Sequence, residues 1–260
     1  MSQLWFLLLY QPLVNALIFL YKIFGGNLGW AIISLTILVR LLVVPLMKPQ
    51  LKAAKKMQEL APELTKIKEK YKNDKQALAK AQMDLYKNAG INPAAGCLPQ
   101  IIQFLVLIAL FQAFSQVLKS DGVAVIEKLN QILYSSLKLS PTSSLNLKFL
   151  WLDLAKPDLI KIPSLPSLPG FFLLLSVIVQ FLSSKMMMPQ AKVAQEQAKK
   201  TESSSDDLSS AMQTQMLYMF PLMTLLVGLT FPSGLVLYWL VFSLVTAFQQ
   251  YSVSQGRDKN

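Results

Sequence analysis

The sequence predicts an all-α, polytopic membrane protein. Of its 260 residues, 53% are hydrophobic, and a mean hydropathy of +0.42 is too high for a soluble domain of this length. A bilayer core about 30 Å thick requires roughly 20 apolar helical residues. Five apolar blocks, separated by basic segments, meet this length: residues 28–47, 98–118, 171–188, 212–230 and 234–251. We therefore expect a bundle of five transmembrane helices.

The lysines predict how these spans are oriented. Residues 48–90 carry eleven lysines and five acidic residues, a net charge of +6, and such basic segments stay on the cytoplasmic side. The first span then runs from outside to inside, and alternation places residues 119–170 outside. Residues 189–211 and the short tail 252–260 are expected to be cytoplasmic. The three-residue turn "FPS" makes the last two spans antiparallel neighbours.

Residues 1–27 contain a further apolar run whose relation to the membrane the sequence leaves open. The run is long enough to cross the bilayer, but Pro12 interrupts it. Gln11, Asn15 and Lys22 recur at intervals of four and seven residues, so they share one face of a helix. We favour an interfacial helix on the outer surface, with the N-terminus outside, over a sixth crossing. No removable signal peptide is expected.

The cytoplasmic segment is helical in composition. Ala, Lys, Glu, Gln, Leu and Met predominate on both sides of "YKNDKQ", where Asn73 is expected to end one helix and Asp74 to cap the next. This predicts a helical hairpin of about residues 50–71 and 74–88. Composition leaves two functions equally supported, a solvated connector or a basic docking arm. The candidate docking residues are Lys55, Lys56, Lys66, Lys68, Lys70, Lys72 and Lys75.

The outer loop, residues 119–170, is expected to begin with a surface helix and to end in extended backbone. The second expectation rests on "KIPSLPSLPG", which has three prolines at three-residue spacing.

The sequence does not predict an enzyme. The chain has no histidine, which excludes Ser-His-Asp, Cys-His and histidine-ligated metal sites. It has no phosphate-binding glycine motif of either common type, and its lone cysteine, Cys97, cannot form an internal disulfide. We expect no catalytic residue, metal or cofactor. The net charge of +11 fits cytoplasmic loops and anionic lipid headgroups better than sequence-specific nucleic acid binding.

Arg40 lies inside the first apolar block, with no acidic residue in that span. It is seven residues, or about 10 Å, from Met47, a depth that costs about 2.5–3.5 kcal/mol on insertion scales. Depth alone supports snorkelling to the headgroups and a water-exposed functional position equally. Polar residues in the other spans favour the second, a hydrated cavity in which Arg40 receives a carboxylate from another protein. These residues are Gln103, Gln112, Gln180, Gln213 and Gln215.

Several motifs in order give the chain a family resemblance. They are "GWAIISLTILVRLLVVPL", "KMQELAPELTKIKEKYKNDKQ", "LYKNAGINPAAGCLPQIIQFLVLIALFQAF", "FLWLDLAKPD" and "FPSGLVLYWLVFSLVTAFQQY". Together they resemble the YidC/Oxa family of membrane protein insertases. The resemblance implies a five-helix core, residues 28–251, around a hydrophilic groove open to the cytoplasm and to lipid. Arg40 matches the groove arginine, with Gln180 and Trp239 as groove-lining partners, and Gln103 is added as a further groove residue.

The resemblance also implies an activity. Such a protein is an insertase and chaperone of the plasma or inner membrane, which takes polar extracytoplasmic segments of nascent clients into the groove and releases their helices into lipid. It acts as a monomer, alone or beside the Sec translocon and ribosome, with the signal recognition particle receptor as a further candidate partner. The hairpin corresponds to the mobile cytoplasmic arm.

The chain departs from some relatives. It shows no large extracytoplasmic domain and no lipoprotein cysteine, and only Arg257 and Lys259 are basic in its tail, so strong ribosome tethering through the tail is not expected. Two other functions stay open. A membrane assembly factor would shield client helices without translocating polar segments, and would tolerate Arg40→Ala. A small-anion carrier is less well supported, because the sequence has no convincing internal repeat.

Overall fold

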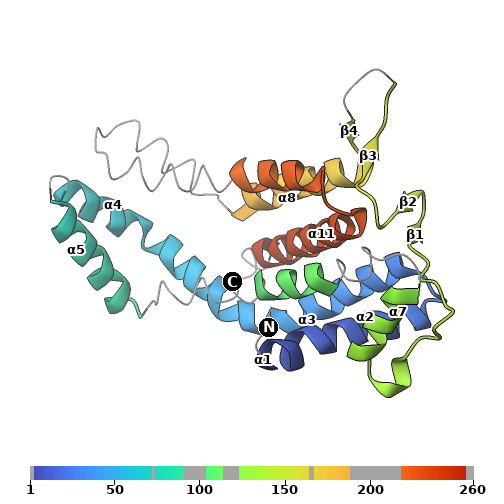
Figure 1. Ribbon diagram of the computed structural model, residues 1–260. Helices are drawn as coiled ribbons and strands as arrows, with labels where there is room; N and C mark the ends of the chain where they lie inside the picture. Colours follow the sequence, from blue (N-terminus) through green and yellow to red (C-terminus); the bar gives the residue numbers. More distant parts are fainter. Residues whose placement is uncertain are drawn as a thin grey trace. The chain divides into compact units, whose positions relative to one another are not determined.

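The computed structural model describes residues 3–71, 74–90, 104–113, 123–163, 167–187 and 218–255, which are mostly helical (Figure 1). The chain divides into two compact units. The first comprises the described parts of Met1–Arg40, Leu105–Met187 and Leu217–Asn260. The second comprises the described parts of Leu41–Phe104.

The first unit begins with one continuous helical stretch: α1 (Gln3–Trp5), the π-helical turn η1 (Phe6–Tyr10) and α2 (Gln11–Ile23). Pro12 lies in the first turn of α2 and has no N–H to donate, and the wider π turn before it lets the helix continue. Pro12 therefore interrupts the apolar run in sequence but does not end the helix. Gly25 and Gly26 end it, with φ of +61° and +81°.

Helix α3 (Leu28–Glu59) is longer than the sequence indicates. It continues past Met47, the expected end of the first span, and takes in the first residues of the expected hairpin. The prediction that a separate helix spans residues 50–71 is therefore wrong about where that helix begins. The break comes at Leu60, and Pro62 lies in the first turn of α4 (Ala61–Lys70), where a proline is tolerated because its missing N–H would have no partner within that helix.

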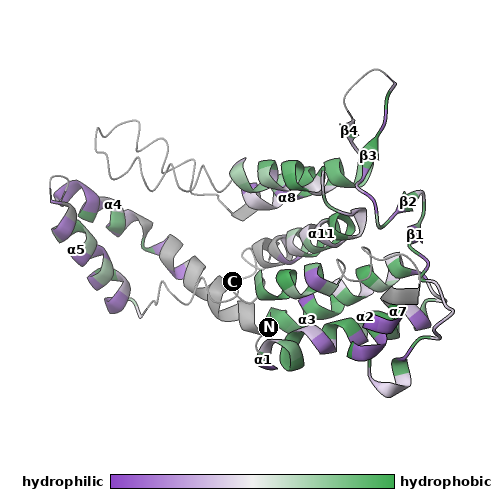
Figure 2. Ribbon diagram, in the orientation of Figure 1, coloured by the Kyte–Doolittle hydropathy of each residue, from purple (hydrophilic) through white to green (hydrophobic). Residues whose placement is uncertain are grey.

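The second half of the hairpin is as expected. α5 (Lys75–Asn88) begins directly after Asp74, whose Oδ1 accepts hydrogen bonds from Gln76 N at 3.1 Å and Ala77 N at 2.9 Å. Asp74 is thus the N-cap that the sequence predicts. Figure 2 shows hydrophilic residues interspersed along α4 and α5, whereas α8 is largely hydrophobic.

The remaining helices belong to the first unit, apart from Phe104, the first residue of the helix Phe104–Ala113. They are Phe104–Ala113, α7 (Val123–Ile132), the short 3₁₀ helix η3 (Ser135–Leu137), α8 (Phe171–Met187), Tyr218–Gly228 and α11 (Ser233–Gln255). α8 packs along α11, and the Ser183 hydroxyl donates to Val179 O at 2.8 Å and lies 3.4 Å from Ser243 O. Small residues of this kind let membrane helices approach closely.

Residues 119–170, named the outer loop after the side on which they are expected, contain strands, so the chain is not purely α-helical. β1 (Lys148–Phe149) pairs antiparallel with β2 (Leu152–Asp153), and β3 (Leu159–Ile160) pairs antiparallel with β4 (Leu168–Pro169). The extended backbone expected near the prolines is confirmed at β4, but it is paired. Pairing in a hairpin lets a non-helical segment satisfy the hydrogen bonds of its own backbone N–H and C=O groups.

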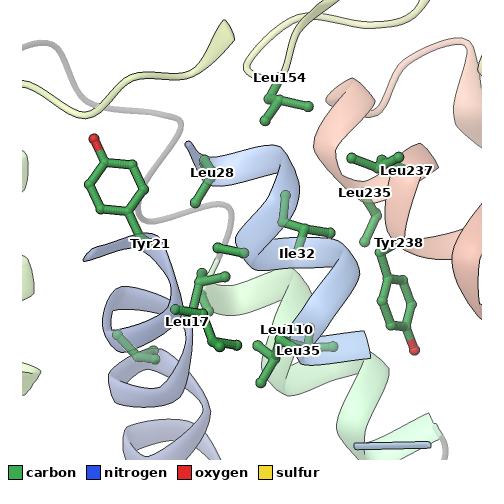
Figure 3. Packing of buried hydrophobic residues seen from close by; sticks show 14 of the residues in the cluster. Leu17, Tyr21, Leu28, Ile32, Leu35, Leu110, Leu154, Leu235, Leu237 and Tyr238 are labelled. Atoms are coloured by element: carbon green, nitrogen blue, oxygen red, sulfur yellow. The ribbon is translucent and has the colours of Figure 1, made fainter. Parts of the chain in front are cut away.

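The core of the first unit joins segments that are far apart in the sequence. Leu28 and Ile32 of α3 lie between Leu17 of α2 and Leu235 of α11, with Leu110 close by (Figure 3). Leu154 of the outer loop belongs to the same cluster. The core therefore includes the loop as well as the helices.

Two described helices are long and apolar enough to cross a membrane, Gln3–Ile23 and Leu28–Pro45. Four shorter apolar helices, Phe104–Ala113, Phe171–Lys185, Tyr218–Gly228 and Ser233–Gln249, fall within the other four expected spans, except that the last begins one residue before its span. The five-span bundle and the interfacial position of residues 3–23 stay predictions.

Candidate functional site

Arg40 is buried between α3 and α11, with 4% of its surface exposed. Its guanidinium carbon lies 3.7 Å from the centre of the Phe242 ring, a cation–π contact. Its Nη2 donates a hydrogen bond to Thr246 Oγ1, and the Thr246 hydroxyl donates to Phe242 O at 2.7 Å. A ring and a hydroxyl, both neutral, thus contact this charge.

The face of α11 that contacts Arg40 also carries Trp239. Residues 239, 242 and 246 recur at intervals of three and four and share one side of the helix. The Trp239 ring stacks on Phe231, with centroids 6.0 Å apart, and Phe231 stacks on Phe111 at 5.2 Å. The structure therefore brings Arg40 and Trp239 to one helix face, where Trp239 takes part in an aromatic stack.

Gln180 lies on α8, one turn before the Ser183 that approaches Ser243 of α11. Its side chain is half-buried, and its Oε1 accepts no hydrogen bond from the residues that the structure describes. A buried acceptor in this state is expected to bind water or another donor. The observation is compatible with a polar interior next to α11.

The other glutamines named from the sequence are not found beside Arg40 among the residues that the structure describes. Gln112 accepts a hydrogen bond from Trp5 Nε1 at 3.1 Å, which ties the N-terminal helix to helix Phe104–Ala113. Gln103, Gln213 and Gln215 lie outside the described residues. The water-exposed Arg40 that a groove would present is not seen, because its side chain is enclosed by α3 and α11. The hydrated groove stays a prediction.

The motif "LDLAKPD" of the outer loop holds the first turns of two helices. Ser233 N donates to Lys156 O at 2.7 Å, Ser233 Oγ to Asp153 O at 2.9 Å and Gly234 N to Leu154 O at 3.1 Å, all at the start of α11. Sequence reasoning did not find this role. No local signal in the sequence points to it, because the acceptors are backbone carbonyls about 80 residues before α11.

The same loop caps α8 through Asp158. This buried carboxylate accepts a hydrogen bond from Leu173 N at 2.9 Å, where the helix N-terminus favours negative charge. Gly170 has room only for hydrogen at this point, because an added Cβ would lie 1.9 Å from Asp158 Oδ1. At the other end of the motif, a hydrogen bond from Lys156 holds the pKa of Asp153 below its ordinary value.

The polar stripe of α2 contacts this loop too. Asn15 is buried; its Nδ2 donates to Gln11 O at 2.8 Å and to Ile132 O at 3.2 Å, while its Oδ1 accepts from Tyr134 N at 2.7 Å. Gln11 Nε2 also donates to Ile132 O, at 3.0 Å, and Lys22 Nζ donates to Lys138 O at 3.3 Å. The stripe therefore binds the backbone that follows α7.

The hairpin lysines are described only in part. Lys56, Lys66 and Lys70 are exposed, and Lys68 is half-buried. Lys72 lies outside the described residues, as do the side chains of Lys55 and Lys75. These exposures fit both functions that composition leaves open for the hairpin.

Comparison with known proteins identifies the family. A family model described as 60Kd inner membrane protein matches residues 19–260. The chain belongs to this family.

Curated relatives within the family carry insertase names. The membrane protein insertase YidC of Fusobacterium nucleatum is 37% identical over 228 residues, which cover 88% of this chain and 86% of that protein. The membrane protein insertase YidC 2 of Listeria innocua is 34% identical over 245 residues, 92% of this chain and 68% of that protein. That of Citrifermentans bemidjiense is 33% identical over 254 residues, 97% of this chain but only 38% of that protein. The resemblance named from the sequence is thus confirmed.

A solved structure shares the fold. The structure titled "Active YidC insertase crystal structure with the first transmembrane domain resolved" has a TM-score of 0.53 at 24% identity, over 93% of this chain and 46% of that chain. The family and this fold make the chain a multi-pass protein of the cell membrane.

Proposed function

We propose that the chain is a membrane protein insertase and chaperone. It takes the polar extracytoplasmic segment of a nascent client towards Arg40 and releases the client's transmembrane helix into lipid. The observation that carries this proposal is a buried arginine contacted by a ring and a hydroxyl in a chain whose curated relatives are named insertases. Insertion makes and breaks no covalent bond, so the protein is not an enzyme and requires no cofactor.

The contacts of Arg40 suggest an exchange. A client carboxylate replaces the Thr246 hydroxyl, because it carries a negative charge and can accept two parallel hydrogen bonds from the guanidinium, whereas the hydroxyl carries no charge. The exchange gives up a hydrogen bond to a charged group, about 1.5–3 kcal/mol, and in part the ring contact, about 0.5–2 kcal/mol. Binding is therefore modest and reversible, as a client that must leave again requires.

Release is driven by the membrane potential and by the transfer of apolar surface into lipid. Moving one negative charge towards a positive exterior gains about 2.3 kcal/mol per 100 mV, which favours outward movement of the acidic segment. The apolar helix of the client then enters lipid beside α8 and α11, with a gain of about 25 cal/mol per Å² of apolar surface buried. α8 offers an exposed apolar stripe for this step: Phe171, Leu174, Ile178 and Leu182.

The contacts of the outer loop support the proposed orientation. The first turns of α8 and α11 bond to residues 153–158, and Phe149 of the same loop packs against Gly29 in the first turn of α3. Three spans that are expected to start outside thus begin beside one loop. The bonds from α2 to residues 132–138 run along the same loop, which supports an interfacial helix over a sixth crossing.

The hairpin is proposed to dock early clients and partners through its exposed lysines, Lys56, Lys66 and Lys70. Candidate partners are the Sec translocon, the ribosome and the signal recognition particle receptor, and the chain acts as a monomer. Replacing these three lysines by glutamine should weaken partner binding at low salt, because such contacts are screened at high salt. Unchanged binding would leave the hairpin as a connector.

One experiment tests the insertase proposal. The purified chain is reconstituted alone in liposomes, and protease protection of a single-spanning client with a short acidic outer tail is measured for wild type, Arg40→Lys and Arg40→Ala. We expect wild type to exceed empty liposomes, Arg40→Lys to retain part of the activity, and Arg40→Ala to lose it. If protease protection with wild type does not exceed that with empty liposomes, autonomous insertion is refuted. Full activity of Arg40→Ala removes the charge-attraction step and favours an assembly factor.

A further inference from the structure

The turn between β1 and β2 exposes two large apolar side chains. Leu150 and Trp151 are each 67% exposed, whereas the flanking Phe149 and Leu152 are buried. Leu150 has a φ of +53°, at the first position of a two-residue turn that usually carries glycine or asparagine. A turn that faces water has no reason to use leucine and tryptophan there. This choice indicates a contact outside the chain.

The turn is held in a fixed direction by the strands beneath it. Phe149 lies so close to α3 that a Cβ added to Gly29 would be 2.1 Å from its ring. The Phe149 ring also meets Trp30 edge-on, with centroids 5.7 Å apart. Since β1 and β2 are paired in register, the orientation of Leu150 and Trp151 follows from these contacts.

The exposed apolar surface of the turn continues onto α8. The Trp151 ring lies 6.1 Å from that of Phe171 and 5.4 Å from that of Phe172, in the first turn of the helix. Phe171 begins the exposed stripe that continues through Leu174 and Ile178. If this stripe faces acyl chains, the turn at its outer end lies at the level of the headgroups. Tryptophan is enriched at that level because its ring is apolar and its N–H is polar.

Lysines on both hairpins complete the pattern. Lys148 in β1 and Lys161 next to β3 are exposed. Long basic side chains beside an apolar surface extend their amines towards lipid phosphates. Lys148 lies two residues before Leu150, so the apolar tip has a neighbouring amine, a charge arrangement that fits a headgroup layer.

We propose that the Leu150–Trp151 turn is a lipid anchor in the outer leaflet. Its tip lies at the boundary between headgroups and acyl chains, and it sets the depth of the outer loop and, through Phe149, of the first turn of α3. The inference rests on the proposed crossing of α8, so its test includes a separate reporter on that helix.

The test uses fluorine NMR of the full chain in lipid nanodiscs. The four tryptophans are labelled as 5-fluorotryptophan, and the Trp151 resonance is assigned by its loss in Trp151→Phe. Intensity loss is compared for lipids with a spin label near the headgroup, lipids with a label deep in the acyl chain, and an aqueous gadolinium chelate. The variant Ile178→Trp supplies the reporter on the exposed face of α8.

We expect the Trp151 resonance to lose most of its intensity with the shallow lipid label and little with the aqueous chelate. The additional resonance of the Ile178→Trp variant should lose most of its intensity with the deep label. A Trp151 resonance lost mainly to the chelate, while the α8 reporter responds to lipid, overturns the anchor and leaves the turn as a site for a soluble partner. An α8 reporter lost to the chelate instead refutes the crossing of α8, and the anchor with it. No client is present, so the outcome is independent of insertion activity.

Discussion

Thr246→Val tests whether Arg40 is held until a client arrives. The substitution removes the hydroxyl that accepts from Arg40 Nη2 and keeps the shape of the side chain. A hydrogen bond to a charged group contributes about 1.5–3 kcal/mol, and a client carboxylate no longer has to replace it. Because the Phe242 contact remains, only part of this energy becomes available, and we expect affinity for an acidic client segment to rise about tenfold, the equivalent of 1.4 kcal/mol.

The assay is binding of a fluorescent client segment to the chain in nanodiscs, with an acidic outer tail or with the same tail neutralised by alanine. The gain should be confined to the acidic tail. Thr230→Val is the matched control, because it removes an exposed hydroxyl that bonds only locally, to Val227 O at 2.9 Å. An equal gain for both tails, or an unchanged affinity in a protein that still folds, would refute the reasoning. Resistance to unfolding by SDS should also fall, since the Arg40 donor loses its acceptor.

Three further predictions concern the outer loop. Asp158→Ala should lower the free energy of unfolding by about 1–3 kcal/mol, because Leu173 N loses its acceptor. Asp158→Asn keeps an oxygen at that position and should lower it less. Equal losses in the two variants would contradict the capping role. Asn15→Leu should speed amide hydrogen exchange at Tyr134, which bonds to Asn15 Oδ1; unchanged exchange would mean that α2 does not hold the loop. The lowered pKa of Asp153 means that its contribution to stability is complete above the ordinary value of 3.8 and is lost as pH falls through the folded-state value. The free energy of unfolding of Asp153→Asn should therefore depend less on pH in this acid range. An acid profile identical to that of wild type would rule out the contribution.

Much of the local structure could be predicted because its causes lie within a few residues. Asp74 caps α5 as expected, since a short carboxylate before a helix satisfies the first free N–H groups. The limits of α3 could not be read in the same way. Hydropathy indicates where a span ends, but the helix continues into the basic segment as far as Glu59, because that segment is rich in residues that favour helix.

The candidate site was predicted in part. Arg40 and Trp239 were named from depth and family motifs, and the structure shows that Arg40 contacts the face of α11 that carries Trp239. The direct partners of Arg40, Phe242 and Thr246, were not named, because they lie more than 200 residues from Arg40 and neither is unusual within its own helix. The capping role of Asp158 was missed for a similar reason, since its helix begins thirteen residues later.

The sequence by itself determined the membrane class, the family and the position of the one charge in the first apolar block, because hydropathy, lysine placement and motifs are properties of the chain. Only the tertiary structure decided that the polar stripe of α2 binds the outer loop, that this loop caps α8 and α11, and that Arg40 is enclosed by an aromatic ring and a hydroxyl. The physical reason is that a polar group in an apolar environment must find a partner, and the fold determines which distant residue is close enough to be that partner.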